Sequence, residues 1–205
     1  MYELANRNIL ERIGKGKFRI GSGNTFVPEL TTKHFKVSAA IKSKFPFTQY
    51  CIWDSSFLKE FSQHIFKSNF MLVDVERDSE ESVYQLLREQ FKEVFLMPGK
   101  EILGDFFSDL KRPIIVRTLV SEAPYKIFRN IPVASLEKII VDIFSDEEFV
   151  YLQSNELALM IKAAFERYTI SESKLVRYAD RKRKKKMLLD FLATNKIKEL
   201  YNGQQ

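Results

Sequence analysis

The sequence predicts a mixed α/β (α+β) fold with an N-terminal partial winged helix-turn-helix, a central α/β layer built on a mostly parallel sheet, and a C-terminal helical region. Three patterns predict it: a short helical segment that leads into a basic hairpin, β-branched runs that alternate with helical segments, and helical apolar spacing after Pro132. The expected domains are residues 1–24, 25–131 and 132–205.

The first element is a helix followed by a hairpin. Residues 2–10 have the apolar spacing of a short helix, and residues 13–20 form a glycine-punctuated basic segment that predicts a hairpin. In a winged helix, such a helix enters the major groove and the hairpin tip contacts phosphates. Met1 stands almost inside the recognition helix, so we expect a partial module. An ordinary hairpin with a solvated tip is the open alternative.

The central region alternates between strands and helices. The apolar, β-branched runs predict strands at 49–53, 70–75, 94–97 and 113–119. The segments between and before them predict helices at 31–44, 55–65, 79–91 and 100–110. Strands separated by helices favour a largely parallel sheet.

The last third is predicted to be helical. Apolar residues recur at helical spacing in 136–144 and 157–168, and helices also fit 172–180 and 184–200. Residues 181–186 are six consecutive cations between two of these helices. Such a run binds phosphates with a strong salt dependence, because each neutralised phosphate releases counterions. A solvated helix start or linker is the competing interpretation.

The charge is distributed unevenly along the chain. Residues 1–48 carry nine Lys/Arg against three Asp/Glu, residues 49–180 carry 16 against 22, and residues 181–205 carry eight against two. This order predicts that the ends meet a polyanion and that the middle meets a basic partner. Uneven surface solvation would give the same pattern.

Composition excludes several classes of protein. Cys51 is the single cysteine, so neither a disulfide nor a cysteine-based zinc site can form within the chain. We expect a cytoplasmic protein without membrane segments, because no apolar run approaches 18 residues and no secretory signal is present. His34 and His64 lack metal-ligand spacing, and the motifs of hydrolases, phosphate-binding loops and dinucleotide sites are missing. No catalytic residue, metal or cofactor is predicted.

A metal-dependent nuclease is the alternative enzyme hypothesis. Asp54, Asp74 and Glu76 stand at the ends of predicted strands, and nucleases place metal-binding acids on such strands. No Glu-x-Lys triplet follows Glu76, so helix capping and surface charge around 78–81 is the competing interpretation.

Several segments together resemble AbiEi-like antitoxins of type IV toxin-antitoxin systems. The segments that carry the resemblance are Cys51-Ile52-Trp53, Val73 to Asp78 with Glu81-Ser82-Val83, Ile115-Val116-Arg117, Leu119 to Pro124, and Pro132 to Phe144. The resemblance implies an N-terminal winged helix that represses its own promoter and a domain that counteracts a nucleotidyltransferase toxin, which itself carries the catalysis.

The leading hypothesis is therefore a non-enzymatic, antitoxin-like regulator. Its expected partners are a cognate nucleotidyltransferase toxin and promoter DNA. By the resemblance and the charge pattern, the expected DNA-binding residues are Arg7, Arg12, Lys15, Lys17, Arg19, Arg181, Lys182, Arg183, Lys184, Lys185 and Lys186. A purely structural interaction module remains a third possibility.

Overall fold

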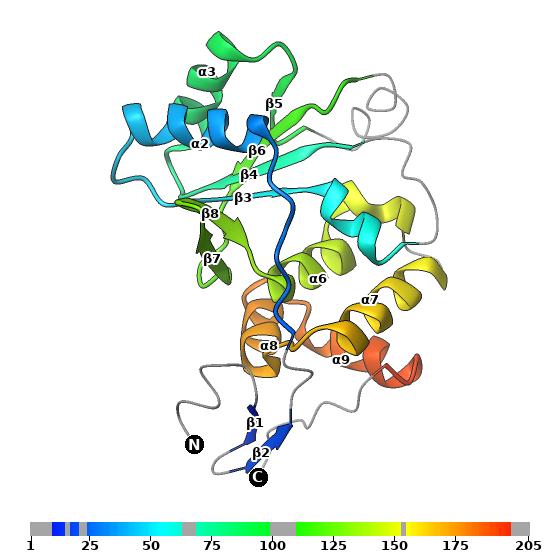
Figure 1. Cartoon of the computed structure of the whole chain (residues 1–205). Coiled ribbons are helices and arrows are strands. Elements are labelled where there is room, and N and C mark those ends of the chain that lie inside the picture. The colour runs from blue at the N-terminus through cyan, green and yellow to red at the C-terminus, as the bar shows by residue number, and fades with distance from the viewer. Residues whose placement is uncertain are drawn as a thin grey trace. The chain divides into compact units, whose positions relative to one another are not determined.

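The computed structural model describes residues 10–14, 17–20, 24–62, 69–98, 110–152 and 155–197. The chain divides into two compact units (Figure 1). Residues 28–134 form one, called here the sheet unit. Residues 1–27 and 135–205 form the other, called the helical unit.

The sheet unit is built on six strands. They are β3 (Tyr50–Asp54), β4 (Met71–Val75), β5 (Val94–Leu96), β6 (Ile114–Thr118), β7 (Tyr125–Phe128) and β8 (Ile131–Ala134). Their order in the sheet is β5-β6-β4-β3-β8-β7. Three of the five neighbouring pairs are parallel, and β3–β4 and β7–β8 are antiparallel. The predicted mixed α/β fold with a mostly parallel sheet is therefore confirmed.

The central strands β3 and β4 are buried over their whole length. Their sequences, YCIWD and MLVDV, are nearly continuous apolar runs, as expected for strands covered on both faces. An acid interrupts each run, Asp54 at the end of β3 and Asp74 inside β4. A buried carboxylate is tolerated only where hydrogen-bond or ionic partners compensate its charge.

Helices α2 (Thr32–Lys44) and α3 (Glu80–Gln90) contact each other and are drawn together on one side of the sheet (Figure 1). Val37 and Ile41 are buried on α2, and Val83 and Leu87 are buried on α3. The helix expected at 55–65 is instead a 3₁₀ helix, η1 (Ser55–Glu60), and residues 63–68 lie outside the described part. Nearly all of the helix expected at 100–110 also lies outside it.

The hairpin β7–β8 was not predicted. Its turn is formed by Arg129 and Asn130, which have φ values of 48° and 64°. Two consecutive positive φ values are the geometry of a type I′ turn, which normally signals itself by Asn-Gly or Asp-Gly. Pro132 also argues against a strand, because proline cannot donate to the ladder.

The helical unit contains the N-terminal hairpin and the C-terminal helices. Strands β1 (Leu10–Gly14) and β2 (Lys17–Ile20) pair antiparallel, as predicted. The remaining elements are α6 (Leu136–Ser145), η2 (Glu147–Leu152), α7 (Asn155–Arg167), α8 (Glu172–Arg181) and α9 (Lys185–Thr194). The helix expected at 2–10 lies almost wholly outside the described residues, so the winged helix remains a prediction.

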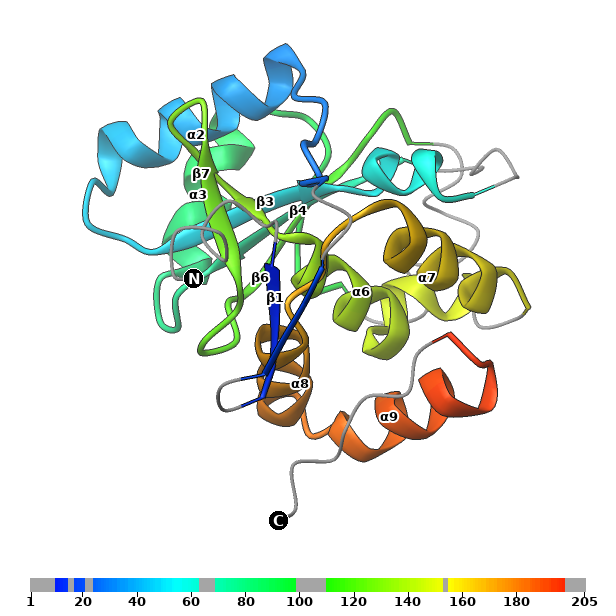
Figure 2. The same ribbon diagram turned by 60° about the horizontal axis from the view of Figure 1, so that its bottom comes forward.

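Helix α6 contacts η2, α7 and α8, and α8 contacts α9 (Figure 2). The chain that follows the hairpin is joined to the α7–α8 connection. The Thr169 amide donates to the Asn24 carbonyl at 3.0 Å, and the rings of Phe26 and Tyr168 meet edge to face at 5.5 Å. Within the described ranges, no helix is both long and apolar enough to cross a membrane.

Candidate nucleic-acid interface

The basic run 181–186 spans the connection between α8 and α9: Arg181 ends α8, and Lys185 and Lys186 begin α9. Arg183 N donates to the Asp180 carbonyl at 2.9 Å, and Lys184 N donates to the Ala179 carbonyl at 2.8 Å. These two bonds are those of a Schellman motif, in which glycine usually occupies the left-handed position. Here that position is Arg183, with φ of 58°. A non-glycine residue in the left-handed conformation costs roughly 1–2 kcal/mol of conformational free energy, so the backbone is strained at Arg183.

Lys182 is the one cation of the run that folds inward. Its ammonium group donates to Asp142 Oδ1 at 2.9 Å and also to Asp146 Oδ1. The Lys182 side chain is only 12% exposed. Both aspartates belong to the end of α6, so the basic connection is anchored to the helix beneath it.

Asp142 is the centre of this buried network. Its other oxygen, Oδ2, accepts from Lys138 Nζ at 2.5 Å, and the Tyr178 hydroxyl donates to Oδ1 at 2.9 Å. The ammonium groups of Lys138 and Lys182 lie 5.7 and 5.6 Å from the centre of the Tyr178 ring. The two lysines, the two aspartates and the tyrosine thus compensate each other's charges and hydrogen-bonding groups. Charges are tolerated in a protein interior under this condition.

A second contact fixes α8 to α6. Glu137 Oε1 accepts from the backbone amide of Ser171 at 2.9 Å, and its Oε2 accepts from the Ser135 hydroxyl at 2.5 Å. Ser171 precedes α8 and Ser135 precedes α6. Glu137 therefore links the starts of α6 and α8, and Asp142 links α6 to the end of α8. Helix α8, which precedes the α8–α9 connection, is thus fixed to α6 at both of its ends.

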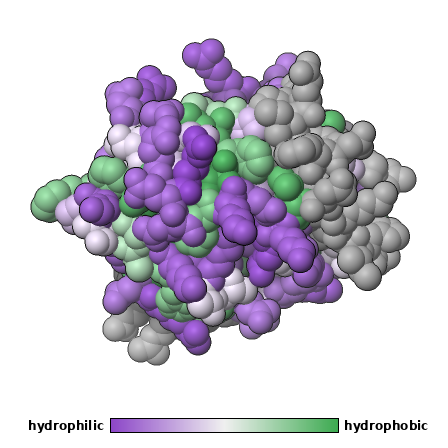
Figure 3. Space-filling model, turned by 90° about the horizontal axis from the view of Figure 1, so that it is seen from above, coloured by the Kyte–Doolittle hydropathy of each residue, from purple (hydrophilic) through white to green (hydrophobic). Residues whose placement is uncertain are grey.

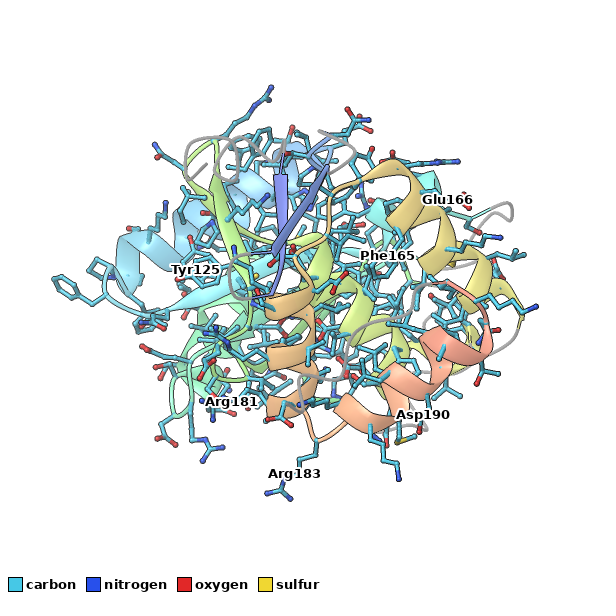
Figure 4. The ribbon with its side chains drawn as sticks, turned by 90° about the horizontal axis from the view of Figure 1, so that it is seen from below. Tyr125, Phe165, Glu166, Arg181, Arg183 and Asp190 are labelled. Atoms are coloured by element: carbon cyan, nitrogen blue, oxygen red, sulfur yellow. The ribbon has the colours of Figure 1, made fainter. Side chains whose placement is uncertain are left out.

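Most of the other cations of the run are exposed. Arg181, Arg183, Lys185 and Lys186 are exposed, and Lys184 is half-buried. Figure 4 shows the Arg183 side chain extending away from the ribbon. An anchored turn that displays several cations is suited to bind neighbouring phosphate groups of a polyanion.

The structure describes only part of the hairpin site. Arg7 and Lys15 lie outside the described residues. Arg12 on β1 pairs with Phe18, and Arg19 on β2 pairs with Glu11; Lys17 begins β2 opposite Gly14. Hairpin and basic run belong to the same unit.

The carboxylates of the nuclease hypothesis are not brought together. Asp54 pairs with Met71 in the ladder, whereas Asp74 pairs with Cys51, three residues away. Because side chains alternate along a strand, Asp54 and Asp74 lie on opposite faces of the sheet. Among the described residues, no group of three acids, histidines or cysteines could hold a metal ion.

Each of these aspartates is instead paired with an arginine. Asp74 Oδ1 accepts from Arg117 Nε at 2.7 Å on the neighbouring strand. Asp54 Oδ2 accepts from Arg112 at 3.1 Å, and Asp54 Oδ1 accepts from the Ser56 amide at 2.8 Å, capping η1. Glu76 is half-buried just after β4.

His34 completes the cluster around Asp54. Its Nδ1 accepts from the Thr31 amide at 3.0 Å, so the ring serves in the N-terminal cap of α2. Its Nε2 faces Asp54 Oδ2 at 3.9 Å, which is too long for a hydrogen bond. Burial lowers the pKa of His34, and Asp54 partly offsets this effect. His34 is therefore a buried, neutral structural histidine at physiological pH.

Sequence reasoning missed Lys138, Asp142 and Tyr178. The available signal was the spacing of Lys138 and Asp142, an oppositely charged i,i+4 pair inside the otherwise apolar helix LEKIIVDIF. On a helix with buried residues all round, such a pair indicates a partner from another element. That partner is α8, which supplies Tyr178, together with its C-cap residue Lys182.

Comparison with known proteins places the chain in a family but transfers no activity to it. No significant match exists among curated proteins or among solved structures. Residues 1–198 match the family described as Family of unknown function (DUF6577), and the chain belongs to this family.

Proposed function

We propose that this protein is a non-enzymatic, cytoplasmic regulator of the antitoxin type, whose helical unit binds DNA. The observation that carries the DNA-binding part is the α8–α9 connection. One lysine, Lys182, is ion-paired inside the unit, and the exposed cations around it are displayed from a fixed turn. This arrangement reduces the conformational entropy that is lost on binding phosphates.

The arginine at the strained turn position supports this proposal. A glycine would relieve the left-handed conformation at position 183, yet the chain places a cation there. Strain of this kind at an exposed position suggests a function for the side chain. The predicted basic hairpin lies in the same unit, so both basic segments are available to one DNA molecule.

The antitoxin part rests on the resemblance of the central and C-terminal segments to AbiEi-like proteins. One of those segments, 132–144, contains Lys138 and Asp142 of the buried network. The proposed partner is a nucleotidyltransferase toxin, and the proposed DNA is the protein's own promoter. The geometry favours no second function, because Asp54 and Asp74 are separated by the sheet and paired with arginines.

Arg183→Gly separates DNA binding from folding. Glycine suits the left-handed position, so we expect the thermal stability to be unchanged or higher, by up to about 1 kcal/mol. Affinity for duplex DNA should fall, and the slope of log K against log salt should decrease by about 1. Lys162→Ala, an exposed lysine on α7, is the matched control. Equal DNA affinity and salt slope in Arg183→Gly and the parent protein would contradict the assigned interface.

The antitoxin part is tested in cells. A nucleotidyltransferase encoded beside this protein is induced with the full chain, with residues 28–205, or with no second protein. We expect survival only when the chain is present, and survival with residues 28–205 would place antitoxicity outside the hairpin. Loss of survival in the presence of the full chain would refute the antitoxin proposal while leaving the DNA measurement unaffected.

A further inference from the structure

Helices α2 and α3 form a face of the sheet unit whose charges are complementary to those of the same face on a second copy. Helix α2 carries four lysines and no acid over Thr32–Lys44. Helix α3, which contacts it, carries three glutamates and one arginine over Glu80–Gln90. Lys36 and Lys44 on α2 and Glu81 and Glu89 on α3 are all exposed. The face is therefore divided into a basic helix and an acidic helix that lie side by side.

The start of α2 lies beside the end of α3, so the two helices run in broadly opposite directions. The ammonium group of Lys33, at the start of α2, lies 5.9 Å from the ring centre of Phe91, which follows the end of α3. With a rise of 1.5 Å per residue, Lys36 and Glu89 lie about 4.5 and 3 Å from this level. Lys44 and Glu81 lie about 16.5 and 15 Å from it. For antiparallel axes, each exposed lysine is therefore close in height to an exposed glutamate.

We propose that the protein forms a two-fold symmetric dimer through this face, with α2 of each copy packed antiparallel on α3 of the other. A two-fold axis that runs along and between the helices exchanges their positions but keeps every residue at its height. Lys36 of one copy then meets Glu89 of the second, and Lys44 meets Glu81. The interface is isologous, so each contact occurs twice. This inference goes beyond the proposed function.

Exposed apolar residues lie on α2 and in the turn that follows it. Phe35 on α2 is 38% exposed, and Phe47, in the turn after α2, is 95% exposed. The turn is closed by the Thr48 amide, which donates to the Phe45 carbonyl at 3.2 Å. Figure 3, which looks at the molecule from above, shows hydrophobic surface between hydrophilic side chains. Aromatic side chains flanked by charges are typical of interface cores with a polar rim.

Charge separation selects a second copy over a polyanion or an anionic membrane. An extended anionic surface that approached the lysines of α2 would also meet Glu81 and Glu89 of α3. A rotated copy offers an acidic helix to the basic one and a basic helix to the acidic one. Arg88, the one cation of α3, is held over the Tyr84 ring at 5.4 Å.

Charge reversal of the full chain tests the dimer by light scattering after size exclusion, at low salt and after nuclease treatment. The Lys36→Glu/Lys44→Glu variant and the Glu81→Lys/Glu89→Lys variant should each raise the dissociation constant of the dimer by about tenfold or more. Because one variant has glutamate at all four of these positions and the other has lysine at all four, their mixture should form a heterodimer. All four substitutions in one chain should restore the homodimer.

The control variant reverses two exposed lysines of the same unit that lie outside α2, Lys59→Glu/Lys126→Glu, and should dimerise as the parent does. Circular dichroism confirms that each variant is folded. A parent protein that is monomeric at every concentration would overturn the proposal. So would a dimer that tolerates both charge reversals, or an association that nuclease treatment abolishes.

Discussion

Asp142 in the helical unit and Asp54 in the sheet unit are both fully buried carboxylates, but their surroundings differ. Asp142 is held by two lysines, Lys138 and Lys182, which are 1% and 12% exposed, and by the Tyr178 hydroxyl. Asp54 is held by one backbone amide and by Arg112, which is 38% exposed. Its third neighbour, His34, remains at 3.9 Å.

This difference shows that the stability lost with a buried acid depends on how deeply its positively charged partners are buried. Without Asp142, two buried ammonium groups lose their shared counter-charge. Without Asp54, the half-exposed Arg112 can turn toward water, and His34 is already neutral because burial lowers its pKa. The predicted effects therefore decrease from the helical unit to the sheet unit.

Removal of the Asp142 charge should have the largest effect. Asp142→Asn keeps the shape and one acceptor for Tyr178, but it removes the carboxylate that pairs with Lys138 and leaves Lys182 with Asp146 alone. We therefore expect the free energy of unfolding to fall by about 3–5 kcal/mol. Urea unfolding measures this change. Asp190→Asn, an exposed position on α9 (Figure 4), should stay within about 0.5 kcal/mol of the parent. Equal stability of the two variants would refute the network's role.

A double-mutant cycle sharpens the same comparison. Lys138→Met removes the ammonium group that loses its partner in Asp142→Asn. The double variant Lys138→Met/Asp142→Asn should therefore lose less free energy of unfolding than the two single variants lose together. The expected coupling is about 1–3 kcal/mol. Additive changes would indicate that Lys138 and Asp142 do not stabilise each other.

Removal of the Asp54 charge should cost less. Asp54→Asn retains an acceptor for the Ser56 amide, and Arg112 can be solvated, so we expect a loss of about 1–3 kcal/mol in the free energy of unfolding. Asp54→Ala also removes the cap of η1 and should add about 1 kcal/mol to that loss. Urea unfolding of both variants provides the measurement. A loss from Asp54→Asn that equals the loss from Asp142→Asn would erase the distinction between the two sites.

Much of the fold could be predicted from local patterns. Strands β3, β4, β5 and β6 and helices α2, α3, α6, α7, α8 and α9 lie where hydrophobic periodicity places them. The hairpin β7–β8 could not, because its type I′ turn uses Arg129 and Asn130 instead of a glycine pair. Local patterns could not predict the strand order either, because β8 lies beside β3 and pairs Val133 with Ile52, 81 residues apart in the chain.

The candidate site could be predicted only in outline. Six consecutive cations between two helices are visible in the sequence, and the structure confirms their position. The sequence does not reveal that Lys182 turns inward. That choice depends on Asp142 and Asp146, which lie 40 and 36 residues away in the chain. Tertiary contacts decide which charges of a basic run face solvent.

The smallest expected effect is a pH dependence in the sheet unit. Burial lowers the pKa of His34 below its ordinary value of 6.5, so the unfolded chain gains a proton before the folded chain does. Stability is therefore full above about pH 6.5 and falls as the pH decreases toward the folded-state pKa, by at most about 1.4 kcal/mol per pH unit. Below the folded-state pKa the loss levels off.

His34→Gln tests this dependence while keeping the helix cap. Glutamine at this position can accept the hydrogen bond that the Thr31 amide now donates to His34. Melting temperatures between about pH 7.5 and 5 should fall more steeply for the parent than for His34→Gln. His64→Gln, which removes the other histidine, is the matched control. The difference between the curves of the parent and His34→Gln reports the contribution of the His34 ring. Parallel curves for the parent and His34→Gln would show that the buried ring takes up its proton as readily in the folded chain as in the unfolded one.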